Sequence, residues 1–136
     1  FRVGFFFIFS RQIQEMSQKI CEKFNGQTPA IIEDLLCLPG VGRKTANLVV
    51  TIAHKKQGIC VDTHVHRICN RWGYVNTNSP EKTEQVLRQK LPRKYWIPLN
   101  RILVAFGQNQ CVPISPWCSS CDVAQFCGKV GVTSSR

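Results

Sequence analysis

The stretch Leu38-Pro39-Gly40-Val41-Gly42-Arg43-Lys44-Thr45-Ala46 decides the fold of this chain. An apolar run with helical spacing precedes it at residues 31–36, and a second apolar run follows at residues 46–53. The two glycines between these runs let the backbone enter conformations that a side chain forbids. The pattern therefore predicts a helix, a tight hairpin and a second helix over about residues 30–53.

The hairpin and the first turn of its second helix are expected to bind an anion. Free backbone amides point outward there, and the positive end of the helix dipole lies behind them. The chain has 18 Lys and Arg against 8 Asp and Glu, a formal charge of +10, so a DNA phosphate is the expected anion. The candidate DNA-contacting residues are Gly40, Val41, Gly42, Arg43 and Thr45.

The rest of the chain predicts an all-α fold. Apolar residues recur at helical spacing, and no segment shows the period-two alternation of a strand. Thr28 and Pro29 are expected to open the helix before the hairpin. The other expected helices are residues 13–24, closed by Asn25 and Gly26; residues 63–72, opened by Asp62; residues 80–91, opened by Ser79; and a last helix, begun or broken at Pro98, that ends near Gly107.

Several apolar and thiol side chains are expected to serve packing alone. The run Phe5–Phe9 is too short to span a bilayer, which takes about 20 residues, so it predicts a buried packing segment and no membrane partner. Four of the eight cysteines stand singly and are expected to be buried free thiols: Cys21, Cys37, Cys60 and Cys69. Trp72, Trp96 and Trp117 are assigned to packing, and His64 and His66 to solvated helix positions.

The C-terminal cysteines form a candidate metal site. After a helical region of residues 1–107, cysteine, proline, serine and glycine dominate residues 108–136. Cys111, Cys118, Cys121 and Cys127 lie there, separated by six, two and five residues. Clustered thiolates bind zinc or an iron–sulfur cluster, and zinc is the second choice because a zinc ribbon has two Cys-x-x-Cys pairs and this segment has one. Two disulfides are a further, less favoured alternative.

Lys44 and Asp62 are the candidate catalytic residues. The helix dipole and the neighbouring Arg43 both disfavour a positive charge on Lys44, and a neutral amine can attack a sugar carbon to give a Schiff base. A plain contact between Lys44 and a phosphate is the alternative, which the residues by themselves favour. Asp62 is expected to cap its helix, and its carboxylate can also stabilise positive charge developing on a sugar.

Three motifs together resemble the endonuclease III family, helix-hairpin-helix DNA glycosylases of base excision repair. They are residues 38–46, Val61-Asp62-Thr63-His64, and the four-cysteine run from Cys111 to Cys127. The resemblance implies a partial helical barrel in which those cysteines hold a [4Fe–4S] cluster. It also implies that Lys44 is the nucleophile and Asp62 its partner. The related adenine-excising branch lacks a lysine at this position, so Lys44 distinguishes the two.

The implied activity is that of a bifunctional DNA glycosylase and abasic-site lyase. The implied substrate is double-stranded DNA with a flipped, oxidised pyrimidine or an abasic site, cut by β-elimination through a Schiff base at Lys44. A monomer inside the cell is expected, in the cytoplasm or nucleoid if the source is prokaryotic and in the nucleus or a mitochondrion if it is eukaryotic.

Two departures from the family bear on this expectation. The family has further helices before the matching segment, so the chain is expected to be incomplete at its N-terminus. The loop of residues 112–117, often basic in the family, has no basic residue. The alternative function is a DNA-binding helix-hairpin-helix and iron–sulfur module without catalysis.

Overall fold

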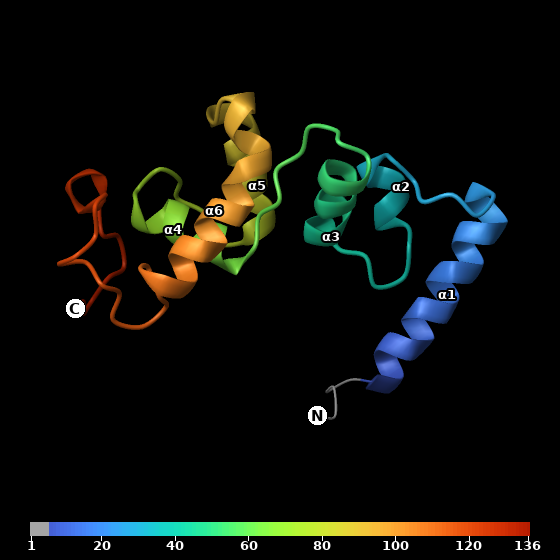
Figure 1. Ribbon diagram of the computed structural model, residues 1–136, viewed down its shortest axis with the longest axis horizontal. Coiled ribbons are helices and arrows are strands. Elements are labelled where there is room, and N and C mark those ends of the chain that lie inside the picture. The colour runs from blue at the N-terminus through green and yellow to red at the C-terminus, as the bar shows by residue number, and fades with distance from the viewer. Residues whose placement is uncertain (1–5) are drawn as a thin grey trace. The chain divides into compact units, whose positions relative to one another are not determined.

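The computed structural model describes residues 6–136 and consists of two compact units, Phe1–Lys56 and Gln57–Arg136. Each unit has a buried apolar core of its own. The described residues form helices and loops without a strand, which confirms the all-α prediction (Figure 1). The change of composition after Gly107 falls inside the second unit.

Residues 6–56 of the first unit form three α-helices and a π-helical turn. These are α1 (Phe6–Phe24), α2 (Ile32–Leu36), α3 (Arg43–Leu48) and the π-turn η1 (Val49–Ala53). Asn25 and Gly26 end α1 with φ of 51° and 74°, and the Gly26 amide donates to the Ile20 carbonyl at 3.1 Å. This left-handed termination is the predicted one.

The core of the first unit joins α1 to the two helices of the hairpin. Its buried members are Leu35, Leu38, Ala46 and Val50, and Met16, Ile20 and Phe24 of α1 pack against them. The helix before the hairpin begins at Ile32, later than predicted, and Pro29 is buried outside it. Ile31 is extended, with φ −120° and ψ 137°, so no helix can run through it from Pro29.

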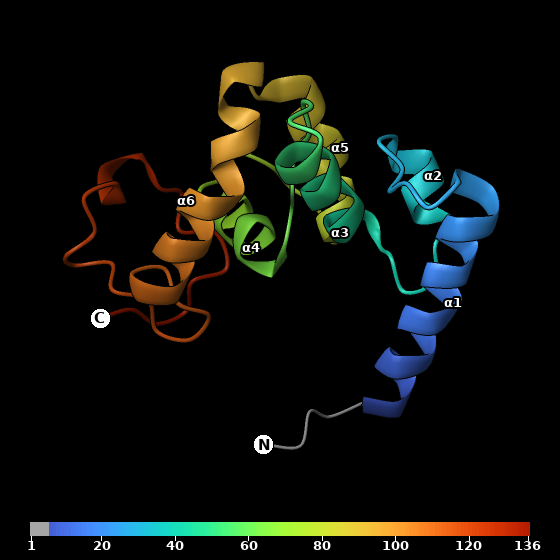
Figure 2. The same ribbon diagram turned by 45° about the vertical axis from the view of Figure 1, so that its right-hand side comes forward.

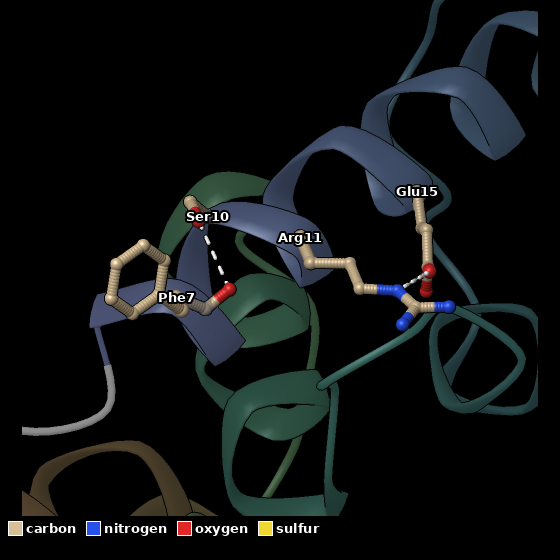
Figure 3. Close-up of polar contacts among 4 residues, drawn as sticks. All are labelled: Phe7, Ser10, Arg11 and Glu15. Atoms are coloured by element: carbon tan, nitrogen blue, oxygen red, sulfur yellow. Dashed lines mark hydrogen bonds and ion pairs between the residues drawn. The ribbon is translucent and has the colours of Figure 1, made fainter.

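The N-terminal turns of α1 are held locally and carry exposed apolar side chains. Ser10 Oγ donates to the Phe7 carbonyl at 3.0 Å, and Arg11 Nε donates to Glu15 Oε1 at 2.7 Å (Figure 3). The Phe6 side chain is 63% exposed and that of Phe7 84%, so the predicted burial of this run is wrong for residues 6–9. The apolar packing of this unit meets α1 from Met16 onward, beyond these turns. Phe5 lies outside the described residues. No described helix combines the length and apolarity needed to cross a membrane.

The second unit is organised around the contact of two helices. Its elements are α4 (Thr63–Arg71), α5 (Pro80–Lys90), the 3-10 turn η2 (Arg93–Tyr95), α6 (Trp96–Asn109) and the 3-10 turn η3 (Ala124–Phe126). In both ribbon views α4 lies next to α6 (Figures 1 and 2). Arg71, the last residue of α4, contacts the segment that follows α6. Residues of α4, α5 and α6 form the buried core of this unit, among them Val65, Ile68, Cys69, Leu87, Trp96 and Leu103.

The helix ends of the second unit follow the predicted signals. Ser79 Oγ accepts from the Lys82 amide at 3.3 Å, and Pro80 is the first residue of α5. Pro98 lies in the first turn of α6, where its missing amide is not needed, so the helix begins before it at Trp96.

Burial of the single cysteines divides between the two units. Cys60 and Cys69 of the second unit are buried as predicted. Cys21 and Cys37 of the first unit are exposed, so the prediction is wrong for them. Cys21 lies on a face of α1 that the core does not use, and Cys37 caps α2 at the entrance to the hairpin.

Candidate DNA-binding hairpin and cysteine cavity

The two hairpin glycines have different roles. Gly40 has φ +74°, and a Cβ added there would lie 3.0 Å from Gln12 Oε1 of α1. Gly42 has φ −94° and ψ 175° and forms the N-cap of α3, and a Cβ added there would meet no atom within 4 Å. The backbone therefore requires glycine only at Gly40, which corrects the expectation for Gly42. At Gly42 the space in front of the backbone stays open.

The hairpin exposes the candidate DNA-contacting residues. The Val41 amide donates to the Leu38 carbonyl at 3.2 Å and closes the turn. Gly40, Gly42 and Thr45 are exposed, while Val41 and Arg43 are half-buried. The anchoring residues Leu38 and Ala46, on either side, are buried. The turn is therefore held by a backbone hydrogen bond and by the buried residues on either side, and its exposed residues are accessible to a ligand.

Lys44 and Asp62 are each positioned by their own unit. Lys44 is exposed and is the second residue of α3, directly behind the hairpin. Asp62 is buried and caps α4, as predicted: its Oδ1 accepts from the amides of His64 at 2.9 Å and Val65 at 3.0 Å. Both amides donate to Oδ1, so the helix cap uses one of the two carboxylate oxygens.

The two helix histidines make specific side-chain contacts, contrary to the predicted solvated positions. Arg67 Nη2 lies 3.1 Å from His64 Nδ1, and because arginine can only donate, Nδ1 accepts and the imidazole proton sits on Nε2. His66 Nδ1 lies 2.7 Å from Thr83 Oγ1 of α5. Both rings are half-buried because they lie between helices.

Two arginines of α4 hold the start of the cysteine segment. Arg67 Nη2 donates to the carbonyls of Gly107 at 3.0 Å and Cys111 at 2.9 Å. Arg71, which is buried, donates to the carbonyls of Val112 at 2.7 Å and Pro113 at 2.6 Å. Burial and the nearby charge of Arg71 lower the pKa of Arg67. The two guanidinium groups donate to carbonyls that the last turn of α6 and the loop after it leave unpaired.

Gly107 lets α6 approach α4 closely at this point. A Cβ at Gly107 would lie 2.6 Å from His64 Nδ1 and 3.0 Å from Arg67 Nη2. The helices therefore need a glycine here for reasons of space, and its carbonyl is one that Arg67 binds. Residue spacing did not identify Arg67, Arg71 or Gly107 as site residues, because their contacts cross about 40 positions of sequence.

All four predicted cysteine ligands line one cavity of the second unit. Arg71 Nη1 donates to Cys111 Sγ at 3.3 Å, and the Lys129 amide donates to Cys127 Sγ at 3.4 Å. The rest of the lining is mostly apolar, with Trp72, Phe106 and Trp117 among it. Trp117 is 40% exposed. The prediction that it serves packing therefore holds only for the face of the ring that lines the cavity. Among residues 6–136, no three His, Cys, Asp or Glu side chains converge closely enough to hold one metal ion.

The chain is similar to known repair proteins over most of its length. Residues 3–93 match the family described as HhH-GPD superfamily base excision DNA repair protein. Endonuclease III of Thermotoga maritima is 47% identical over 118 residues, which cover 87% of this chain and 55% of that protein. Endonuclease III-like protein 1 of Bos taurus is 43% identical over 122 residues, which cover 88% of this chain and 40% of that protein. This chain therefore spans about half the length of the relatives that it matches.

Solved structures show the same architecture. A trapped endonuclease III–DNA covalent intermediate matches with a TM-score of 0.82 and 36% identity over 88% of this chain and 57% of that chain. A thermostable thymine-DNA glycosylase matches with a TM-score of 0.77 and 26% identity. The all-helical fold and the family match agree, and the chain belongs to the HhH-GPD superfamily of base excision DNA repair proteins.

Proposed function

We propose that this chain carries the hairpin, the nucleophile and the cofactor segment of a DNA glycosylase and abasic-site lyase that acts on double-stranded DNA. The observation that carries the proposal is the position of Lys44. It is exposed, and it follows the exposed Gly40–Gly42 turn by two residues. A DNA strand gripped at the turn would place a deoxyribose within reach of the lysine amine. The proposed substrates are oxidised pyrimidines and abasic sites in DNA, which implies a role inside the cell.

The proposed reaction begins with attack of Lys44 Nζ on C1′ of the deoxyribose. The damaged base leaves, or is already absent at an abasic site, and the open sugar forms a Schiff base with the lysine. Loss of a proton from C2′ then expels the 3′ phosphate by β-elimination, and water releases the lysine. The carboxylate of Asp62 is proposed to stabilise the positive charge that the sugar develops as the base leaves. Its Oδ1 is occupied by the helix cap, so this role falls to Oδ2.

We propose further that Cys111, Cys118, Cys121 and Cys127 hold a [4Fe–4S] cluster. Four thiols and a mostly apolar lining suit such a cluster, and a segment with one Cys-x-x-Cys pair in place of the two of a zinc ribbon favours it over zinc. Arg71 and the Lys129 amide donate hydrogen bonds to two of the four sulfurs, those of Cys111 and Cys127. When bound, the group supplies a compact cross-link for a segment that has little regular structure.

Reductive trapping tests the nucleophile. Borohydride reduces a Schiff base to a stable amine, so protein mixed with DNA containing an abasic site should form a covalent complex. Lys44→Ala should abolish this complex, while Lys23→Ala, which removes an exposed lysine from the last turn of α1, should leave it at the wild-type yield. Equal trapping by wild type and Lys44→Ala would refute the assignment. Salt-sensitive DNA binding by a wild-type chain that never traps would instead support the binding module without catalysis.

A further inference from the structure

The last nine residues of the chain fold back over the cysteine cavity. The Gly128 amide donates to the Trp72 carbonyl at 3.3 Å, and the Val130 amide donates to the Arg71 carbonyl at 2.9 Å, which attaches the segment to the end of α4. Lys129 and Val132 then line the cavity itself. We call residues 128–136 the C-terminal strap.

The last residue of the strap, Arg136, forms backbone hydrogen bonds on both sides of Cys118. The Arg136 amide donates to the Pro116 carbonyl at 2.8 Å, and the Ser119 amide donates to the Arg136 carbonyl at 2.9 Å. These two backbone bonds bracket Trp117 and Cys118. The backbone on each side of Cys118 is therefore hydrogen-bonded to the strap, a segment outside the loop that contains Cys118.

The Arg136 side chain adds two contacts to the same loop. Its Nε donates to the Ser115 carbonyl at 3.1 Å, and its guanidinium carbon lies 4.0 Å from the centre of the Trp117 ring. Trp117 in turn lines the cavity, and Gln110 Nε2 at the end of α6 donates to its carbonyl. A planar cation stacked on an indole restricts the ring on its outer side.

We propose that Arg136 is a positioning residue that latches the C-terminal strap onto the loop and so retains the cofactor in the cavity. The inference rests on the proposed cluster. Cys111 is held by the arginines of α4, and Cys127 by the bonds at the start of the strap. Cys118 lies between two exposed residues, Trp117 and Ser119. Gln110 at the end of α6 accepts from the Trp117 amide and donates to its carbonyl, and the strap supplies the contacts from farther along the chain. Opening of this loop is then the step that admits water or a chelator.

The test measures cofactor loss from the full chain, purified without oxygen and loaded with iron. Visible absorbance is followed after addition of an iron chelator. Arg136→Ala should lose its absorbance faster by about five- to tenfold, because one hydrogen bond and one cation–π contact are gone. Arg136→Lys should be intermediate, since a cation remains without the planar fork. Arg11→Ala removes the same charge from an exposed position on α1 and should lose iron at the wild-type rate.

A double-mutant cycle ties the effect to the stacked pair. Trp117→Ala should accelerate the loss as well, and the double variant should be no faster than the quicker single variant. Loss at the wild-type rate in Arg136→Ala would overturn the latch.

Hydrogen exchange at the Ser119 amide tests the latch without reference to iron. This amide bonds to the Arg136 carbonyl, so its exchange should be slow in the wild type and faster by a similar factor in Arg136→Ala. Unchanged exchange would also overturn the latch. Wild-type protein that binds stoichiometric zinc and no iron would overturn the cluster proposal, while the Ser119 measurement would still decide for or against the latch.

Discussion

Arg71 Nη1 donates to Cys111 Sγ at 3.3 Å, while Nη2 of the same guanidinium donates to the Pro113 carbonyl at 2.6 Å. One buried side chain of α4 therefore contacts a proposed cluster ligand and fixes the loop that follows it. Arginine suits this role because its fork can bind several acceptors in one plane and keeps its charge when buried.

Arg71→Ala should reduce the free energy of unfolding by about 1–3 kcal/mol, because the carbonyls of Val112 and Pro113 and a cysteine sulfur lose their charged donor. Arg71→Lys should fall between this variant and the wild type, since an ammonium reaches fewer of the acceptors. Denaturant unfolding followed by circular dichroism measures the change. Arg101→Ala, at an exposed position on α6, is the matched control. An Arg71→Ala midpoint equal to the wild type would show that the loop is held by other contacts.

Gly107→Ala should destabilise the protein although alanine is the better helix former. An exposed helical Gly→Ala change gains about 1 kcal/mol. Here the new methyl would lie 2.6 Å from His64 Nδ1 and 3.1 Å from His64 Cβ, so either the His64 side chain or α6 must shift, which disturbs the neighbouring Arg67 contacts. We expect a net loss of about 1–3 kcal/mol in thermal or denaturant unfolding. Gln108→Ala, one residue along and exposed, should be neutral. A more stable Gly107→Ala protein would contradict the close approach of the two helices.

The two hairpin glycines should separate folding from binding. Gly40→Ala should cost about 1–2 kcal/mol of stability, because φ is +74° and Gln12 lies 3.0 Å away. Gly42→Ala should change stability by less than about 0.5 kcal/mol, because its Cβ would enter open space at an ordinary φ. If DNA backbone occupies that space, Gly42→Ala should still weaken DNA binding, as measured by fluorescence anisotropy. Full-strength binding by Gly42→Ala would place the DNA elsewhere.

Asp62 should show two roles that its variants can divide. Asp62→Ala removes the helix cap and should cost about 1 kcal/mol of stability. Asp62→Asn keeps an oxygen that can accept from His64 and Val65, so its stability should stay close to the wild type. If the carboxylate charge supports catalysis, both variants should lose excision activity on damaged DNA to a similar degree. An active Asp62→Asn enzyme would reduce Asp62 to a cap.

Stability should fall in alkaline solution partly through Cys69. Burial raises the pKa of this thiol from 9.0 to about 11. Below pH 9 the thiol is protonated in both folded and unfolded chains and has no effect. Between pH 9 and about 11 only the unfolded chain loses the proton, so this site lowers stability by up to about 1.4 kcal/mol per pH unit. Cys69→Ala should have a lower absolute stability but a shallower slope over this range, measured by urea unfolding. An identical slope would exclude Cys69 as the titrating group.

Local signals in the sequence predicted much of the fold. Asn25 and Gly26 end α1, Asp62 caps α4 and Ser79 caps α5, because such ends depend on neighbouring backbone. The cysteine spacing likewise predicted four side chains that share one cavity. These features need no knowledge of distant segments.

Predictions that depended on packing were less accurate. The exposed turn at Phe6 and Phe7 and the exposed Cys21 differ from the prediction, since hydrophobicity alone does not say which partner a side chain meets. Arg71 and Arg136 could not be identified either, because the residues that they bind lie about 40 and 20 positions away. The roles of Lys44 and Asp62 remain predictions that rest on the family.

The π-turn at Val49–Ala53 determines the direction in which the residues directly after the hairpin motif point. The backbone amide of His54 donates to the Val49 carbonyl at 3.2 Å, five residues earlier, whereas an α-helical amide would donate to the carbonyl four residues earlier. One additional residue in a turn rotates the residues that directly follow it by about 100° relative to an uninterrupted α-helix. Lys56 follows, and its Nζ reaches the Ala30 carbonyl at 3.1 Å. Deleting one residue from this turn would restore the α-helical hydrogen-bonding pattern and rotate Lys56 away from Ala30. The additional residue of the π-turn therefore sets the direction in which the Lys56 side chain points at the end of the motif.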